Sequence, residues 1–423
     1  MEEKHNNNSY HELRFTKDED KAIATAPPTT DSKMSFFHTC FNGLNAISGI
    51  GILSVPLALA SGGWLSLFLL FVVAAVTFYT GLLIKNCMDK NSNIRTYADI
   101  GELAFGKIGR LIVTISMYAE LFLVATGFLI LEGDNLSNLF PIGKLQVAGL
   151  EIGQKHFFIV MVALVILPIV WMNNLSLLSY ISASGVFATA IIILSILWTA
   201  TFDGVGFHQK GTLVHWNGIP TAVSLYTFCF CAHPLFPTIY NSMGNKHQFS
   251  NVLLVCFIIA TVGYASMAMI GYTMFGGGVE SQVTLNLPLD KISSRIAIYT
   301  TLVNPISKYV LMTTPITNAL KDLLPRGYNS KVTDIIVSAI LVMSTVIVAL
   351  AVPFFGYLMS LVGALLSVTA SILLPCLCYL KISCNYNKFR FETITIVVIL
   401  LSGIAIGMSG TYMSLNKIVH HMS

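Results

Sequence analysis

Apolar stretches long enough to cross a membrane follow one another along almost the whole chain. A hydrocarbon layer about 30 Å thick takes about 20 helical residues, and we find eleven stretches of roughly this length. They occupy residues 36–60, 64–86, 107–131, 156–173, 178–201, 218–243, 250–276, 292–316, 333–352, 354–380 and 392–414. Because lipid offers backbone groups no hydrogen-bond partners, and no alternating pattern points to a β-barrel, all eleven are predicted to be helices.

The composition excludes a soluble fold. Of the 423 residues, 55% are hydrophobic and 10% are charged, whereas a soluble domain carries about 25% charged residues. So few charged residues cannot form a polar surface around separate hydrophobic cores. The apolar surface must therefore contact the lipid bilayer. The formal charge of +4 is mild and gives no sign of nucleic-acid binding. We therefore expect an all-α integral membrane protein.

Charged residues also predict the topology. Residues 1–35 are polar, so we expect a disordered tail. They also lack the pattern of a cleavable signal peptide. Basic residues accumulate in cytosolic loops, and 17 of the 24 Lys and Arg residues fall on the same side as this tail, against 6 on the other. The N terminus is therefore predicted to be cytosolic, with a membrane domain over residues 36–414. Residues 415–423 would form a short lumenal or extracellular tail.

The first apolar stretch contains a segment that weakens a helix. Gly49 and Gly51 lower helix propensity, and Pro56 removes an intrahelical hydrogen bond. Unwound backbone at membrane depth is tolerated only where it is buried in protein or lines a watery cavity, so a break here would mark a binding site. The alternative is close packing of helices through small residues.

The sixth stretch carries a second such segment, around His233, Pro234 and Pro237. Breaks in helices 1 and 6, five helices apart, are typical of an inverted repeat of five plus five helices with the binding site at the repeat interface. Repeat one would span about residues 36–201 and repeat two about residues 218–380. The eleventh helix, 392–414, would then be an addition to the repeat.

The backbone of such a break suits a zwitterion. Freed N–H groups around Gly49, Ile50 and Gly51, at the start of the following half-helix, favour a carboxylate, whereas freed carbonyl groups favour an ammonium group or a cation. Glycine allows a ligand to approach closely because it has no Cβ atom. The pattern therefore predicts a small dipolar ligand, although short Gly-x-Gly pairs are weakly specific alone.

Two charged side chains, Glu120 and Lys308, fall well inside predicted spans. A charge at the bilayer centre costs about 2.5–3.5 kcal/mol on insertion scales, so each needs a compensating role. A mutual ion pair or snorkelling toward an interface would satisfy them without a function. Lys308 lies too deep in its helix to snorkel, and its ammonium group could take the place of a bound cation. Such a placement would favour coupling to protons over coupling to sodium.

Glu120 and His233 are the candidates for carrying a proton. Glu120 is the only carboxylate that the predicted spans place deep in the membrane, although its burial could serve structure alone. His233 adjoins the second break, and an imidazole changes charge near physiological pH. A buried, hydrogen-bonded histidine is the structural alternative.

The sequence gives no sign of catalytic or metal chemistry. The two C-x-C pairs, Cys229/Cys231 and Cys376/Cys378, lack a second pair or a nearby histidine cluster at metal-binding spacing. No intramembrane Asp pair, zinc-type His motif or nucleotide-binding loop occurs. We therefore expect no catalytic residues, no metal and no cofactor, and a membrane enzyme is the weaker alternative.

Four segments resemble one known family. They are residues 43–56, 128–136, 228–243 and 308–315. These segments are similar to the amino acid/auxin permease family, most closely to its plant vacuolar amino acid transporters. The resemblance extends from about residue 35 to the end of the chain, and the Gly-Ile-Gly-Ile-Leu-x-x-Pro core at residues 49–56 is its most specific part.

The resemblance implies an eleven-helix fold of the APC/LeuT type and proton-coupled transport of neutral amino acids across the vacuolar membrane, as antiport or symport. It implies a substrate site made of Ser48, Gly49, Ile50, Gly51, Phe228, Cys229 and His233. Glu120 and Lys308 rest on the membrane-charge argument alone. Two alternatives stay open, a proton/amino acid symporter of the plasma membrane and a sensor that binds amino acids without moving them.

Overall fold

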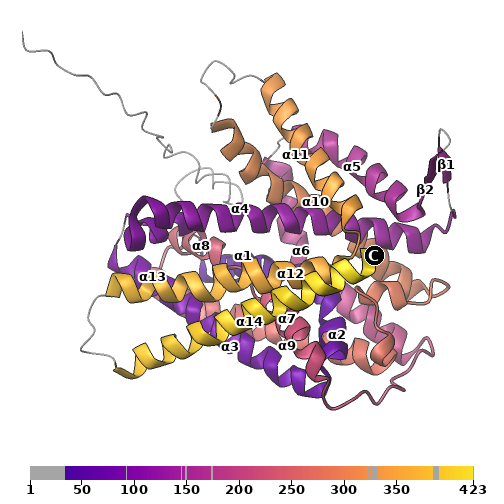
Figure 1. Ribbon diagram of the computed structural model, residues 1–423, viewed down its shortest axis with the longest axis horizontal. Coiled ribbons are helices and arrows are strands. Elements are labelled where there is room, and N and C mark those ends of the chain that lie inside the picture. The colour runs from indigo at the N-terminus through magenta and orange to yellow at the C-terminus, as the bar shows by residue number, and fades with distance from the viewer. Residues whose placement is uncertain are drawn as a thin grey trace, which may run out of the picture.

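Long helices run through the molecule in both directions and make up nearly all of it (Figure 1). The computed structural model describes residues 34–91, 93–143, 145–147, 150–172, 175–322, 324, 331–383 and 390–422. The predicted N-terminal tail, residues 1–35, therefore lies outside the described residues except for Met34 and Ser35.

The elements in chain order are α1 (Phe36–Ile47), α2 (Gly51–Gly62), α3 (Trp64–Lys90), α4 (Tyr97–Leu139), β1 (Leu145–Val147), β2 (Leu150–Ile152), α5 (Gln154–Met172), α6 (Leu175–Thr201), α7 (Ile219–Cys229), α8 (Phe236–Ser242), α9 (Phe249–Phe275), α10 (Ile292–Asp322), α11 (Lys331–Ala351), α12 (Phe355–Val362), α13 (Leu374–Ser383) and α14 (Arg390–Met422). The strands β1 and β2 form a small antiparallel hairpin with Leu145 opposite Ile152. Within the described residues this hairpin is the only sheet.

The first apolar stretch is interrupted where the glycines predicted. Helix α1 ends at Ile47 and α2 begins at Gly51, and Ser48 between them has non-helical angles, φ −75° and ψ 78°. Pro56 lies inside α2 without ending it. The discontinuity therefore lies at the Ser48–Ile50 segment itself.

The sixth stretch is interrupted as well. Helix α7 ends at Cys229, a turn of 3₁₀ helix covers His233–Leu235, and α8 begins at Phe236. Ala232, with φ −132° and ψ 7°, is non-helical. Pro234 and Pro237 lie at the starts of this 3₁₀ turn and of α8. Proline suits these positions because the first N–H groups of a helix have no intrahelical acceptor.

Eight helical segments among the described residues are long and apolar enough to cross a membrane, judged by length and composition. Two of them are composite, because Trp216–Ser242 contains α7, the second interruption and α8, and Phe355–Ser383 runs from α12 to α13. Helices α1 and α2 have 12 residues each, so neither half of the broken first stretch reaches the roughly 20 residues that a span requires. The all-helical membrane fold is thereby established, whereas the count of eleven helices and the internal repeat stay predictions.

The third span is longer than its apolar run. The sequence predicts a helix over 107–131, but α4 extends from Tyr97 to Leu139, with non-helical angles at Phe105 and Gly106 dividing it. Gly106 has φ 65°, a conformation that glycine adopts at little cost. Beyond residue 131 the helix continues with polar side chains, since this part of α4 is buried in protein.

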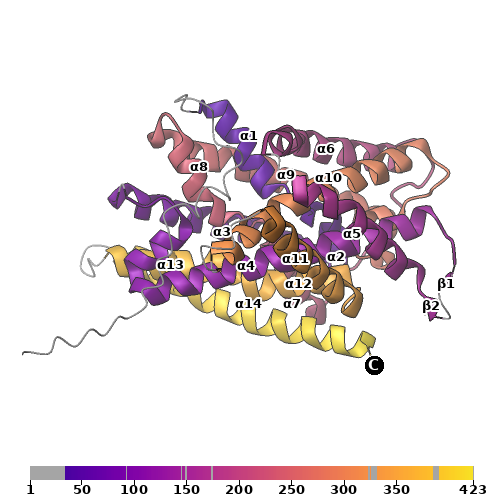
Figure 2. The same ribbon diagram turned by 90° about the horizontal axis from the view of Figure 1, so that it is seen from above.

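The tenth and eleventh stretches also differ from the simple prediction. Between α12 and α13 the chain forms two turns of π helix, Gly363–Ser367 and Thr369–Leu373, and π turns are frequent at functional sites. Helix α14 continues to Met422, so the segment 415–422 is part of this helix and does not form a separate tail. Figure 2 shows α14 along one edge of the molecule.

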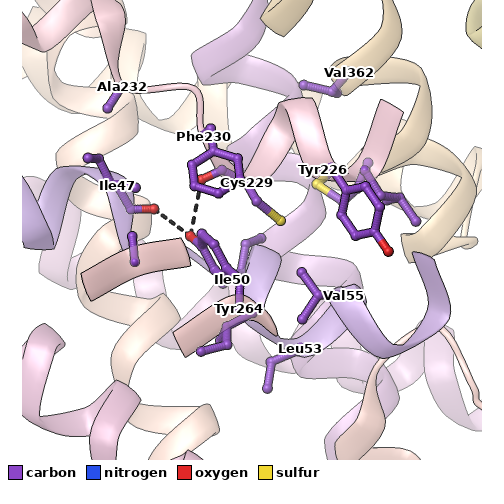
Figure 3. Packing of buried hydrophobic residues seen from close by; sticks show 14 of the residues in the cluster. Ile47, Ile50, Leu53, Val55, Tyr226, Cys229, Phe230, Ala232, Tyr264 and Val362 are labelled. Carbon is purple, nitrogen blue, oxygen red and sulfur yellow. Dashed lines mark hydrogen bonds between the residues drawn. The ribbon is translucent and has the colours of Figure 1, made fainter. Parts of the chain in front are cut away.

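The broken helices lie at the centre of the core. Helices α2 and α7 pack against each other, and α9 packs against α2. Among the largest fully buried side chains are Leu53 of α2, Tyr226 of α7, and Phe230, which follows α7. Figure 3 shows Ile47 at the first interruption close to Cys229 and Phe230 at the second. The two breaks therefore face each other inside the protein, away from lipid.

Candidate functional site

A cavity of about 200 Å³ lies between the two interruptions. The breaks themselves provide part of its wall, and α1, α4, α8 and α10 provide the rest. The lining residues are Asn42, Asn45, Ala46, Ile47, Gly49, Ile50, Gly51, Met117, Glu120, Leu121, Val124, Phe128, Phe228, Cys229, Cys231, Ala232, Pro234, Leu235, Thr238, Ile239, Lys308, Leu311, Met312 and Pro315. Five predicted substrate residues, Gly49, Ile50, Gly51, Phe228 and Cys229, are thus brought together.

The cavity extends toward the end of the bundle at which α1 begins. Its lining residues on α1, such as Asn42, precede the first break, and those on α8, such as Thr238 and Ile239, follow the second break. On α10 the lining continues from Lys308 to Pro315, in the same direction. Helices α1 and α8 lie side by side at this end (Figure 2). A ligand would therefore reach the breaks from the face that carries the N terminus of α1.

Lys308 supplies a cation to the first break. Its side-chain nitrogen donates a hydrogen bond of 2.9 Å to the carbonyl oxygen of Ser48, a group that the interruption of the helix sets free. The residue is buried, with 8% of its surface exposed. The structure thus places the amine of Lys308 at the first break, and its role in place of a bound cation stays a prediction.

Ser48 itself does not line the cavity, in contrast to its predicted role in binding substrate. Its hydroxyl group donates to the hydroxyl group of Thr189 on α6 at 3.0 Å, and its carbonyl group accepts from Lys308. The hydroxyl and carbonyl groups of Ser48 therefore anchor the break, because the unwound backbone turns them toward α6 and α10.

Glu120 forms part of the cavity wall and is also buried, with 8% exposed. Its carboxylate accepts a hydrogen bond of 2.5 Å from Ser367 in the π-helical segment, and Cys231 lines the same cavity. Of the ion pairs formed between described residues, none joins Glu120 to Lys308. A mutual ion pair therefore does not explain these two buried charges.

The two glycines of the first break have different roles. A Cβ atom at Gly51 would lie 2.6 Å from the sulfur of Cys229, which is too close for a real contact, whereas one at Gly49 would meet no atom nearer than 4.0 Å. Gly51 therefore allows α2 to approach α7 closely, which corresponds to the alternative of helix packing through small residues. Gly49 leaves open space at the cavity.

Tyr264 on α9 joins the two breaks and was not among the predicted site residues. Its hydroxyl oxygen lies 2.6 Å from the carbonyl oxygen of Ile47 and 3.1 Å from that of Cys229, as Figure 3 shows. Ile47 and Cys229 are the last residues of α1 and α7. No local pattern marks this tyrosine, because its role depends on a contact with segments far away in the chain.

His233 does not line the cavity. It is fully buried, and its Nε2 atom lies 2.9 Å from the hydroxyl group of Thr80 and 3.0 Å from the carbonyl oxygen of Thr77, both on α3. The ring also packs against Phe236. The 3₁₀ turn after the break directs the imidazole toward α3, which corresponds to the structural alternative for this residue.

Glu132 is a second deeply buried carboxylate on α4, so Glu120 is not the only one. Its exposure is 2%, and its Oε1 atom has no hydrogen-bond partner among the described residues. The span predicted from hydropathy ends at residue 131, so Glu132 falls outside it. It does not line the cavity.

No group of three or more His, Cys, Asp or Glu side chains is arranged to hold a metal ion in the part of the chain that the structure describes. Cys229 and Cys231 both line the cavity. The cavity therefore combines two broken backbones, one amine, one carboxylate and many apolar side chains.

Sequence comparisons with known proteins point to amino acid transporters. Residues 32–415 match the family described as transmembrane amino acid transporter protein. Amino acid transporter AVT1I of Arabidopsis thaliana is 58% identical over 386 residues, which cover 91% of this chain and 95% of that protein. Amino acid transporter AVT1J of the same plant is 57% identical and covers 91% of each chain.

A solved structure supports the fold. A Na⁺-coupled sialic acid symporter, determined in a substrate-bound outward-open state, superimposes with a TM-score of 0.53 and covers 90% of this chain and 89% of that chain. Its sequence identity is 12%, so this likeness concerns the transporter fold alone.

Proposed function

Because this chain belongs to the transmembrane amino acid transporter family, we propose that it moves neutral amino acids across the vacuolar membrane in a proton-coupled manner. The movement would occur by alternating access around the cavity between the two helix breaks. The proposal includes the eleven-helix, five-plus-five arrangement over residues 36–414 and a cytosolic N terminus.

The observation that carries this proposal is the position of the cavity between two interrupted helices. Helix α2 begins at Gly51. The N–H groups of Ile52 and Leu53 donate to carbonyl groups of the break, whereas those of Ile50 and Gly51 have no backbone acceptor among the described residues and, at the positive end of α2, would attract a carboxylate. The carboxyl ends of α1 and α7 present carbonyl groups, which suit an ammonium group. A zwitterionic amino acid matches both kinds of group.

The apolar lining supports substrates with neutral side chains. Met117, Leu121, Val124, Leu311 and Met312 form much of the wall. The two charged groups already have partners, since Lys308 donates to Ser48 and Glu120 accepts from Ser367. A charged substrate side chain would therefore lose its hydration here without gaining a free counter-charge.

Proton coupling is supported by the same two groups. The amine of Lys308 donates to a freed backbone carbonyl group, the kind of group that could otherwise coordinate a metal cation. Glu120 provides a carboxylate at the cavity wall that can gain and lose a proton. We propose that a proton on one of these groups, not a sodium ion, is moved together with or against the amino acid.

The function is tested with purified protein in liposomes. Labelled leucine, with glutamate and lysine as charged comparisons, is offered with and without an imposed pH step, at equal sodium on both sides. We expect the pH step to drive accumulation of leucine, with recovery of unmodified leucine inside. Binding without entry would favour a sensor, and a chemically altered product would favour an enzyme.

Cellular location needs its own test, since the vacuolar placement derives from the family resemblance. A fluorescent fusion of the full chain, imaged in plant cells beside markers of the vacuolar and plasma membranes, separates the two locations. Fluorescence at the cell boundary would favour the alternative, a plasma-membrane proton/amino acid symporter.

A further inference from the structure

We propose that Tyr264 is a positioning residue for the substrate site, because its hydroxyl group sets the distance between the two broken helices. The inference rests on the proposed function, since it assigns to Tyr264 the arrangement of the backbone groups that would bind the amino acid. Tyr264 is not among the residues that line the cavity, so it would act through the carbonyl groups that it holds.

The contacts of the hydroxyl group carry the argument. Its oxygen lies 2.6 Å from the carbonyl oxygen of Ile47 and 3.1 Å from that of Cys229. A phenol has one hydrogen to donate, and two acceptors can share it. One side-chain atom therefore connects the last residue of α1 and the last residue of α7.

The chemistry of helix ends explains why this contact matters. The last carbonyl groups of a helix have no intrahelical partner and carry the negative end of the helix dipole. Here two such ends, from α1 and α7, meet at the cavity, where their partial charges repel. The hydroxyl group of Tyr264 lies within hydrogen-bond distance of both carbonyl groups and offsets this repulsion.

The ring of Tyr264 has a separate structural role. It packs edge-on against the ring of Phe230, with centroids 5.3 Å apart and planes at 90°, and the residue is 2% exposed. A Tyr264→Phe substitution keeps this packing and removes only the oxygen. The substitution therefore tests the hydroxyl contact without opening a cavity in the core.

The first measurement is amino acid uptake by Tyr264→Phe protein in liposomes. Without the hydroxyl group the two carbonyl groups are held less firmly and bind a substrate less well. We therefore expect the KM for leucine to rise about tenfold, the effect of losing one buried hydrogen bond. The maximal rate should stay within about threefold of the unmodified protein. A KM equal to that of the unmodified protein would overturn the proposal.

The matched control is Tyr97→Phe. Tyr97 is equally buried and donates a 2.7 Å hydrogen bond to the backbone carbonyl group of Ala370, and it is not among the residues that line the cavity. Loss of this bond should leave the KM unchanged. A similar rise in KM for both variants would show a general effect of losing a buried phenol and would contradict the specific role of Tyr264.

A second measurement does not depend on transport. Cys229, whose carbonyl group Tyr264 holds, is 4% exposed, and its alkylation by N-ethylmaleimide can be followed by mass spectrometry of the protein in detergent. We expect alkylation to be about fivefold faster or more in Tyr264→Phe, because the end of α7 opens more often, and unchanged in Tyr97→Phe. Equal rates in all three proteins would overturn the positioning role.

The two measurements separate the two proposals. If the unmodified protein takes up no amino acid but Tyr264→Phe exposes Cys229, the proposed function fails while the helix ends are still held by Tyr264. If the unmodified protein transports leucine and Tyr264→Phe changes neither the KM nor the alkylation rate, the function stands and the positioning role fails.

Discussion

The side-chain amine of Lys308 donates a hydrogen bond of 2.9 Å to the carbonyl oxygen of Ser48, 260 residues earlier in the chain. Ser48 is also held by the hydroxyl group of Thr189. The first helix break is therefore anchored to α10 and α6. Any movement of α1 relative to these helices must change the surroundings of a buried amine, which provides a physical link between a helix motion and a charge.

Replacing Lys308 by methionine tests this link. Methionine keeps an unbranched apolar side chain but removes all three donors, so the carbonyl group of Ser48 loses its partner. We expect leucine uptake driven by a pH step to fall about tenfold or more, the effect of losing one charged hydrogen bond. Uptake rates in liposomes measure the effect.

The control for this substitution is Lys291→Met. Lys291 is exposed and forms an ion pair with its neighbour Asp290 at 3.4 Å, and such surface pairs contribute little. Uptake by this variant should match that of the unmodified protein. Full pH-driven uptake by the Lys308→Met protein would exclude Lys308 from coupling.

A Glu120→Gln substitution separates proton carriage from structure. The amide has nearly the same shape as the carboxyl group and can still accept the hydrogen bond from Ser367, but it cannot titrate. We expect exchange of labelled for unlabelled leucine to continue while accumulation driven by a pH step is lost. Ser367→Ala, which removes the hydrogen bond and keeps the carboxylate, serves as the comparison. Accumulation at the normal level in Glu120→Gln would show that the residue has a structural role only.

The two glycines of the first break should respond differently to alanine. At Gly51 the new methyl group would lie 2.6 Å from the sulfur of Cys229, so we expect a lower yield of folded protein and a lower melting temperature, as for other overpacked cores. At Gly49, where no atom lies nearer than 4.0 Å, folding should be normal and the KM for leucine should rise, because the methyl group enters the cavity.

Size-exclusion profiles and thermal unfolding of the detergent-purified variants check the folding effect. A Gly51→Ala/Cys229→Ala double variant removes the sulfur and should recover part of the lost stability. Equal stability of the two single glycine variants would contradict the packing role assigned to Gly51.

His233 is expected to matter for stability more than for coupling. Its Nε2 atom interacts with Thr77 and Thr80 of α3, so His233→Ala removes two buried hydrogen-bond contacts and should cost about 1–3 kcal/mol. The pH dependence of uptake by the remaining folded protein should keep its shape. A shifted pH profile, measured from pH 5 to pH 8, would restore the histidine as a coupling residue.

Both helix breaks could be predicted because their causes are local. Gly49 and Gly51 weaken a helix wherever they occur, and Pro234 and Pro237 cannot donate backbone hydrogen bonds. Most of the predicted substrate residues lie next to these interruptions, and they line the cavity. Hydropathy was less reliable at the end of α4, where the helix continues past its apolar run and buries Glu132.

By itself, the sequence determined that the chain is a helical membrane protein, where two of its helices are interrupted, and which family it belongs to. These properties depend on composition, on local backbone preferences and on short motifs. Only the tertiary structure decided that Lys308 and Tyr264 reach the breaks, that Ser48 and His233 turn away from the cavity, and that Gly51 is a packing residue. Such contacts depend on how each helix is rotated and placed against distant helices, and side-chain direction of this kind is not encoded in any short segment.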